Sequence, residues 1–197
     1  MDTLIKMIMV ALSAVFVQNI VFTKSLGTST LLMVTKDKKS ILPFGISISY
    51  FCVMSSAVTY FVDKLLKDVE DNFLYYAVSY VIVIGLIYII TLLVMWKFFY
   101  DLFLKTKVFM HLSAFNCAVL GVLFINKLNE FSFIECIVFG LFTGVGFFIA
   151  TFIVSVAYDK LGSEKVPESF RGFPATMLYI GIISMAFFAL VSKGPVL

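Results

Sequence analysis

The stretch Phe115-Asn116-Cys117-Ala118-Val119-Leu120-Gly121-Val122 places an amide and a thiol inside an uncharged run that extends over residues 108–126. Five comparable runs cover residues 7–23, 40–62, 72–96, 136–158 and 172–192. A helix crosses the hydrocarbon core of a bilayer in about 20 residues, and several of the runs are that long. The sequence therefore predicts six membrane-spanning helices. The lone thiol within one of them indicates a redox or ligand site inside the bilayer.

The composition is that of an integral membrane protein. Hydrophobic residues make up 61% of the 197 residues, charged residues make up 14%, and the mean hydropathy is +1.06. A globule in water could not cover such a chain with polar surface. The runs lack the strict alternation of lipid-facing barrel strands, which need only about ten residues each. We therefore expect an all-α integral membrane protein.

The distribution of basic residues predicts the orientation of the chain. Ten of the fifteen lie in the loops that follow odd-numbered spans: Lys24, Lys36, Lys38, Lys39, Lys97, Lys105, Lys107, Lys160, Lys165 and Arg171. The opposite side carries Lys6, Lys64, Lys67, Lys127 and Lys193. Basic loops favour the cytoplasmic side, so both termini are expected on the non-cytoplasmic side. The net charge of +3 then reflects topology, and no nucleic-acid partner is expected.

The chain also carries traces of an internal repeat. Setting residues 29–34 against residues 117–122 brings Phe44-Gly45 close to Phe139-Gly140. Each half holds three spans, so the second half must enter the membrane from the opposite side. We therefore expect a single membrane domain over residues 1–197, built from two inverted three-helix repeats. Repeat 1 would cover about 1–100 and repeat 2 about 101–197.

The first run of each half is the shortest of its half. These two runs have 17 and 19 residues, whereas the others have 21 to 25. Short or interrupted helices at matching positions of two repeats mark binding sites near the membrane midplane, because broken helices free backbone groups. Ser29 and Cys117 lie at these two positions, and Lys24 with Gly27-Thr28-Ser29-Thr30 interrupts the first run. We predict that the first helix of each repeat is short or broken, next to a midplane site.

The strings Asn116-Cys117-Ala118-Val119-Leu120-Gly121-Val122 and Val166-Pro167-Glu168-Ser169-Phe170-Arg171-Gly172 resemble a known membrane family. They look like RnfA and its counterpart NqrE, which are six-helix membrane subunits of the Rnf and Nqr ion-pumping electron-transport complexes. The resemblance covers essentially the whole chain, including Lys24-Ser25-Leu26-Gly27. The RnfA form fits better than the related RnfE or NqrD, mainly because of the second string.

The resemblance implies a function as a membrane subunit of an Rnf-type ferredoxin:NAD oxidoreductase complex. Such a subunit passes electrons across a bacterial or archaeal cytoplasmic membrane and couples this to Na⁺ or H⁺ transport. It is a non-autonomous part of a redox-driven ion translocase, so no catalytic residue is expected here. The implied partners are the flavinylated and ferredoxin- or NAD-handling subunits, together with a homologous inverted subunit of the RnfE type. The loops are too short to hold a flavin- or nucleotide-binding module on this chain.

The resemblance also implies an iron-sulfur cluster of the 2Fe-2S type, held by two cysteines from each of two paired subunits. Cys117 matches the second cysteine position of the family. Ser29 stands at the first, with Thr30 where the family has proline. A serine alkoxide is a poorer ligand at neutral pH than a thiolate, whose pKa is about 8.5 before metal binding.

The replacement leaves several alternatives open. Ser29 can be a ligand, the cluster can have three cysteine ligands, or the cofactor can be different or absent. A cluster-free divergent paralogue would be a transporter-like or structural membrane partner. A small secondary transporter with inverted repeats, unrelated to the family, is the third interpretation.

Other polar residues in the runs have structural interpretations. We expect Asn19 and Asn116 to form hydrogen bonds between helices. His111 is the only histidine, and we expect a structural role for it. The glycines at 140, 144 and 146 indicate close helix packing rather than a phosphate site, since no strand precedes them.

Overall fold

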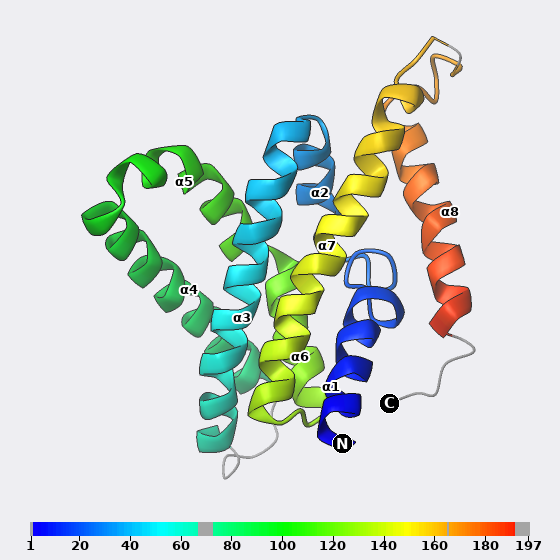
Figure 1. The fold of residues 1–197 in the computed structure, drawn as a ribbon. Coiled ribbons are helices and arrows are strands. Elements are labelled where there is room, and N and C mark those ends of the chain that lie inside the picture. Colours follow the sequence, from blue (N-terminus) through cyan, green and yellow to red (C-terminus); the bar gives the residue numbers. More distant parts are fainter. Residues whose placement is uncertain (1, 67–72, 165, 192–197) are drawn as a thin grey trace.

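The computed structural model describes residues 2–66, 73–164 and 166–191, and these residues contain helices and no strand (Figure 1). The elements are α1 (Asp2–Leu12), the π-helical turn η1 (Ser13–Val17), α2 (Thr28–Thr35), the 3-10 turn η2 (Lys38–Ser40), α3 (Ile41–Leu65), α4 (Phe73–Phe98), α5 (Tyr100–Ala114), α6 (Cys117–Leu128), α7 (Phe133–Leu161) and α8 (Phe173–Val191). The predicted all-α class is confirmed.

The helices account for about six membrane spans. In the described residues, α3, α4 and α7 are long and apolar enough to cross a membrane, and the pair α5 and α6 adds a fourth candidate. Shorter apolar helices cover Leu4–Val17 and Phe173–Ala189. Each uncharged run of the sequence thus coincides with a helix or with a broken helix.

Both helix breaks lie where the sequence predicted them, in the first span of each half. The first span ends at Val17, and the chain resumes helical structure only at Thr28. In the second half, α5 ends at Ala114 and α6 begins at Cys117, with a bend of 50° between them. The division of the chain into repeats near residue 100 stays a prediction.

The spans of the two halves run in opposite directions. In Figure 1, α3 descends beside the ascending α7, and α4 and α8 also have opposite directions. In this view α1 begins at the lower end of the bundle, and α8 runs towards that end. Which side of the membrane this end faces stays a prediction. Three of the basic residues that support the predicted orientation lie outside the described residues, namely Lys67, Lys165 and Lys193.

The α3 and α7 helices form the centre of the bundle, and glycines on α7 allow their close approach. A Cβ atom at Gly140 would lie 3.0 Å from the backbone oxygen of Cys52. At Gly144 it would lie 2.6 Å from the Cα atom of Ser49. The small residues on α7 are therefore packing residues, as predicted.

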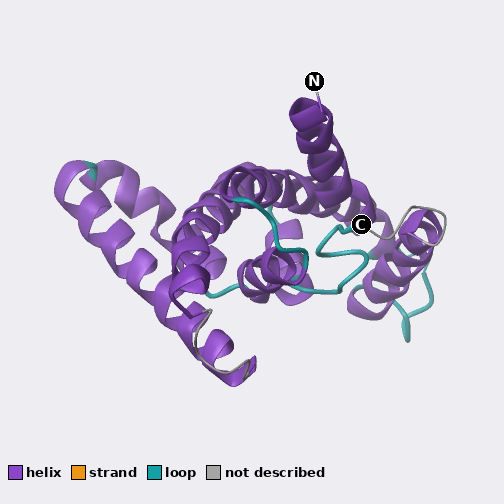
Figure 2. Cartoon of the chain, turned by 90° about the horizontal axis from the view of Figure 1, so that it is seen from below, coloured by secondary structure: helices purple, strands orange, loops and turns teal. Residues whose placement is uncertain are grey.

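The α4 and α5 pair extends to one side of this centre (Figure 2). Its large apolar side chains are exposed, with exposed fractions of 59% for both Ile90 and Leu93. Apolar surface of this kind suits contact with lipid chains or another membrane protein.

Elsewhere, η2 contacts the end of α7 through an exposed ion pair, Lys38 Nζ to Asp159 Oδ2 at 2.6 Å. Exposed pairs contribute little stability, so helix packing holds the bundle together.

We predict that Gly144→Ala destabilises the protein by about 1–3 kcal/mol, the usual cost of overpacking a core. The added methyl group meets the backbone of α3, so the helices must move apart. The matched control is Gly181→Ala on α8, where a Cβ atom would meet nothing within 4 Å. Thermal unfolding of the two variants in detergent measures the difference. Equal midpoints for both variants would contradict the close packing.

Candidate functional site

The first helix break is held by the side chain of Asn19, which is 1% exposed. Its Oδ1 atom accepts hydrogen bonds from the backbone N–H groups of Val21 at 3.0 Å and Phe22 at 3.1 Å. Its Nδ2 atom donates to the backbone oxygens of Val15 at 2.8 Å and Gly146 at 3.3 Å. Asn19 therefore satisfies backbone groups that the break has freed and also ties the break to α7.

The second break is held by Asn116, the N-cap residue of α6. Its Oδ1 atom accepts a hydrogen bond from the backbone N–H of Ala118 at 2.9 Å. Its Nδ2 atom donates to Oγ1 of Thr30 on α2, at 2.7 Å. Asparagine is a preferred N-cap residue because its side chain satisfies an orphan backbone donor at the helix start. Here it also joins the two breaks, so both asparagines link helices as the sequence predicted.

Gly27, the N-cap residue of α2, packs tightly against the second break. Its φ angle is +77°, in the left-handed region that favours glycine. A Cβ atom there would lie 2.7 Å from both Asn116 Oδ1 and Phe147 Cε2. Only a glycine allows this approach without displacing its neighbours.

The approach of Gly27 creates a direct contact with the lone thiol. The backbone N–H of Gly27 donates a hydrogen bond to Sγ of Cys117 at 3.0 Å. Cys117 is the first residue of α6, where the helix dipole favours a negative charge. Hydrogen bonds to a cysteine sulfur are among the features that tune metal clusters held by cysteine.

Ser29 belongs to the first turn of α2, and its side chain is exposed. Cys117 is exposed too. The structure thus places both predicted site residues at the N-terminal ends of α2 and α6, the two half-helices that follow the breaks. These two ends meet on a surface that is open to a neighbouring chain. We refer to Gly27, Ser29, Thr30, Asn116 and Cys117 as the junction.

The other two cysteines lie away from the junction. Cys52 is completely buried in α3. Cys136 is 4% exposed near the start of α7, and its thiol donates to the backbone oxygen of Phe131 at 3.5 Å. In the part of the chain that the structure describes, no three His, Cys, Asp or Glu side chains are grouped so that they could hold a metal ion. A four-ligand cluster at the junction would therefore take further ligands from another chain.

His111 contacts the hydroxyl group of Tyr88 through Nδ1, and the ring of Tyr88 packs against Phe115 with a centroid distance of 5.0 Å. The contact joins α4 to α5 just before the second break. This arrangement agrees with the structural role that we expected for the histidine.

Sequence reasoning did not identify the contacts that Gly27 and Thr30 make with the second break. The signal for Gly27 was present, because glycine before a helical segment indicates a special backbone conformation. The contact from Thr30 to Asn116 joins residues 86 positions apart. No local pattern in the sequence reveals such a contact.

The fold and the junction define a multi-pass α-helical membrane protein with two broken helices that meet at their N-terminal ends. The chain belongs to the family described as "Rnf-Nqr subunit, membrane protein", which matches residues 7–192. The resemblance found in the sequence is confirmed at the level of the family.

Curated relatives match over most of their length. The chain is 29% identical over 181 residues to the A subunit of the Na(+)-translocating ferredoxin:NAD(+) oxidoreductase complex of Acetobacterium woodii, covering 92% of this chain and 94% of the relative. It is 28% identical over 181 residues to the A subunit of the ion-translocating oxidoreductase complex of Vibrio vulnificus, covering 91% and 94%. The corresponding protein of Psychromonas ingrahamii is 27% identical over 176 residues, covering 89% and 92%.

We predict that Gly27→Ala destabilises the protein more than Gly172→Ala does. Both glycines have a positive φ angle, but a Cβ atom at Gly172 would meet nothing within 4 Å. The control therefore carries only the backbone strain, while Gly27→Ala adds the clash with Asn116, worth about 1–3 kcal/mol. Thermal unfolding followed by circular dichroism measures the difference. If the two variants unfold at the same temperature, the tight packing of the junction is wrong.

Proposed function

We propose that the chain is a membrane subunit of an Rnf-type ferredoxin:NAD oxidoreductase, an ion-translocating electron-transport complex. The family match over residues 7–192 and the names of the relatives support this proposal. The complex would lie in a bacterial or archaeal cytoplasmic membrane, with both termini of this chain on the non-cytoplasmic side. The chain would work only together with its partner subunits, because its loops are too short to hold a flavin- or nucleotide-binding module.

We further propose that Cys117 is one ligand of a 2Fe-2S cluster shared with a homologous inverted subunit. The observation that carries this proposal is the hydrogen bond from the Gly27 N–H to Cys117 Sγ, 3.0 Å long, on an exposed thiol. Donors of this kind to sulfur are one of the ways in which proteins tune iron-sulfur clusters. When bound, such a cluster supplies a one-electron carrier inside the bilayer.

The junction can supply one of the thiolate ligands that such a cluster requires. Cys117 fills this position, and the hydroxyl group of Ser29 stands where the family has a second thiol. Asn116 fixes the start of α6 and therefore the direction of the Cys117 side chain. The exposure of Ser29 and Cys117 leaves room for the partner protein to supply the remaining ligands.

Coupling to Na⁺ or H⁺ transport would act through the two half-helices. A change of one unit of charge at the junction has a large electrostatic effect, because the surroundings are apolar. The N-terminal ends of α2 and α6, where the helix dipole favours a negative charge, lie at this position. We propose that oxidation and reduction shift the balance between two positions of these half-helices and thereby open or close an ion path.

One observation favours a second candidate, a cluster-free paralogue that serves as a transporter-like or structural membrane partner. Ser29 provides a hydroxyl group, whose high pKa makes it a weak iron ligand. The two candidates differ in whether the junction holds iron.

The deciding experiment measures iron, acid-labile sulfide and the electron paramagnetic resonance signal after dithionite reduction in the co-purified complex. We expect Cys117→Ala to lose one cluster signal that the wild type has. The matched control is Cys52→Ala, which removes a buried thiol away from the junction and should keep the signal. If the intact wild-type complex shows no such signal once its other centres are accounted for, the cluster-free paralogue is the correct interpretation.

A further inference from the structure

An apolar groove of about 490 Å³ runs between α3 and α7, the two helices at the centre of the bundle. Leu42 and Ile46 line it on α3, and Leu141 and Val145 line it on α7. In Figure 1 the two helices lie side by side, with the start of α3 and the end of α7 towards the same end of the bundle. No residue that lines the groove belongs to the junction.

Glycines on both helices make this groove possible. A Cβ atom at Gly45 would lie 3.0 Å from Cδ2 of Phe148, and one at Gly144 would lie 2.5 Å from Cβ of Ser49. The missing side chains let the helices approach, while larger apolar residues on either side form the walls. Two wall residues of α3, Leu42 and Ile46, have exposed fractions of 59% and 63%, so the groove is open to the surroundings of the bundle.

The polar side chains that line the groove already have hydrogen-bond partners within the chain. Oγ of Ser49 donates to the backbone oxygen of Gly45 at 2.8 Å, one turn earlier on α3. The hydroxyl group of Tyr50 and Oγ1 of Thr91 on α4 form a hydrogen bond of 3.1 Å. The groove therefore offers apolar contact to an occupant, which suits a hydrocarbon chain.

Lysines gather at the end of the groove where α3 begins, which we call the mouth of the groove. Lys39, Leu42 and Ile46 follow one another at intervals of three and four residues on one continuous helical segment, so they share a face. Lys36 lies three residues before Lys39, in the turn after α2, and both lysines are exposed. In the described residues neither of them forms an ion pair.

The aspartates at the mouth already have partners. Asp37 caps η2, where its carboxylate accepts hydrogen bonds from the backbone N–H of Lys39 at 3.1 Å and from Oγ of Ser40 at 2.6 Å. Asp159 on α7 pairs with Lys38 at 2.6 Å. This pair also joins the start of η2 to the end of α7, on either side of the mouth.

The balance of charge at the mouth is positive. The two aspartates there stand against four exposed lysines, namely Lys36, Lys38, Lys39 and Lys160. The next carboxylate after α7 belongs to Glu164 in the following loop, where Arg171 donates to the backbone oxygen of the same residue at 3.5 Å. An anionic group therefore fits the mouth better than a cation does.

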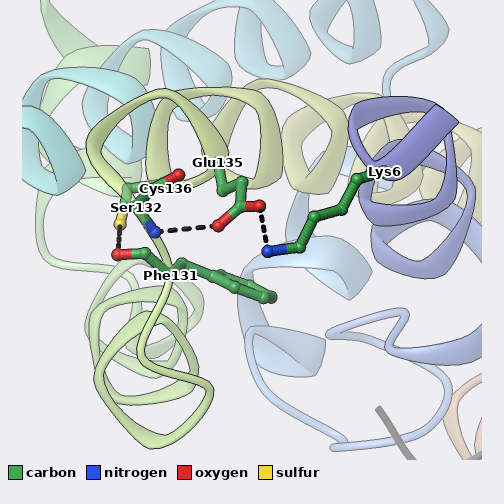
Figure 3. A network of polar contacts seen from close by, with 5 residues as sticks. All are labelled: Lys6, Phe131, Ser132, Glu135 and Cys136. Atoms are coloured by element: carbon green, nitrogen blue, oxygen red, sulfur yellow. Dashed lines mark hydrogen bonds and ion pairs between the residues drawn. The ribbon is translucent and has the colours of Figure 1, made fainter. Parts of the chain in front are cut away.

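The opposite end of the bundle lacks such an excess, because acidic and basic residues line its polar pocket in equal numbers. Nζ of Lys6 lies 2.7 Å from Oε1 of Glu135, whose Oε2 atom accepts a hydrogen bond from the backbone N–H of Ser132 at 2.8 Å (Figure 3). The ammonium group of Lys127 lies over the ring of Tyr76. Two lysines at that end thus have partners within the chain.

The groove has about the length of a lipid chain in one leaflet. From Leu42 to Met54 it extends along α3 for about 18 Å. One leaflet contributes half of a hydrocarbon core of about 30 Å. A chain whose headgroup lies at the mouth would therefore reach the middle of the membrane within the groove.

We propose that the groove between α3 and α7 binds an acyl chain of an anionic phospholipid, with the lipid phosphate next to Lys36 and Lys39. In the orientation expected from the sequence, the mouth faces the cytoplasm, and the cytoplasmic leaflet carries anionic lipids that attract lysine side chains. A lipid that binds the folded chain here would stabilise the central helix pair. The site is separate from the junction, so the proposal does not depend on a cluster.

The test titrates palmitoyl-oleoyl phosphatidylglycerol into the delipidated full-length chain in detergent and counts bound lipid by native mass spectrometry. The comparison lipid is phosphatidylcholine with the same acyl chains, whose headgroup has no net charge. We expect the wild type to bind one phosphatidylglycerol roughly tenfold more tightly than phosphatidylcholine, because two lysines attract the headgroup. Glycerol phosphate, which has no acyl chain, should not bind measurably.

Two variants separate the headgroup contact from the chain contact. Lys39→Gln removes one charge and should raise the Kd for phosphatidylglycerol roughly fivefold without changing that for phosphatidylcholine. Ile46→Trp fills the groove from an exposed wall position and should weaken the binding of both lipids. The matched controls are Lys105→Gln, at an exposed lysine of α5 expected on the same side of the membrane, and Ile90→Trp, at an exposed position of α4 outside the groove. Both should bind lipid as the wild type does.

Equal affinity of the wild type for the two lipids would overturn the proposal. Equal losses in Lys39→Gln and Lys105→Gln would do the same, because the lysines would then act only as general surface charge. If Ile46→Trp leaves lipid binding unchanged, no acyl chain lies in the groove, and a loss of co-purified partner subunits in that variant would identify the groove as a protein contact instead. If Ile46→Trp does not fold, the comparison of Lys39→Gln with Lys105→Gln decides.

Discussion

The backbone groups freed at the two helix breaks must find hydrogen-bond partners inside an apolar bundle, and the rest of the structure depends on how they do so. Water cannot satisfy them in a bilayer, so the chain has to supply the partners itself. Asn19 supplies them at the first break and Asn116 at the second. Each asparagine also binds the backbone or side chain of another element, so the breaks are fixed to α7 and to each other. A break that would otherwise be a weak point becomes a defined junction.

The position of the reactive groups follows from this arrangement. Because Asn116 starts α6 and Gly27 starts α2, the N-terminal ends of both half-helices come together. Cys117 and Ser29 are then brought to one place by backbone geometry, without any contact between their own side chains being required. The thiol receives a backbone N–H from the opposite half, so each half contributes to the environment of the other. The same short helix, α6, also binds α3 near its other end, where Nδ2 of Asn126 donates to Oγ of Ser56.

The sequence predicted much of this structure because its strongest signals are local. The uncharged runs set the number of spans, and the short first run of each half located both breaks correctly. The predicted links through Asn19 and Asn116 and the close packing of Gly144 were also right. Contacts between distant segments, such as Thr30 with Asn116 or Asn126 with Ser56, are set by tertiary packing and have no local pattern. The left-handed conformation of Gly27 depends on the same packing, so its role appears only in three dimensions.

We propose, as the central claim, that Ser29 and Cys117 occupy neighbouring ligand positions of one site at the junction. The most direct measurement compares Ser29→Cys with the wild type in the co-purified complex, by electron paramagnetic resonance during a redox titration. A thiolate in place of a hydroxyl group at a ligand position must change the spectrum and the reduction potential, or create a signal where the wild type has none. We predict such a change, and Thr28→Cys, one residue earlier on α2, should leave the spectrum as it is. Identical spectra and potentials for Ser29→Cys and the wild type would contradict the claim.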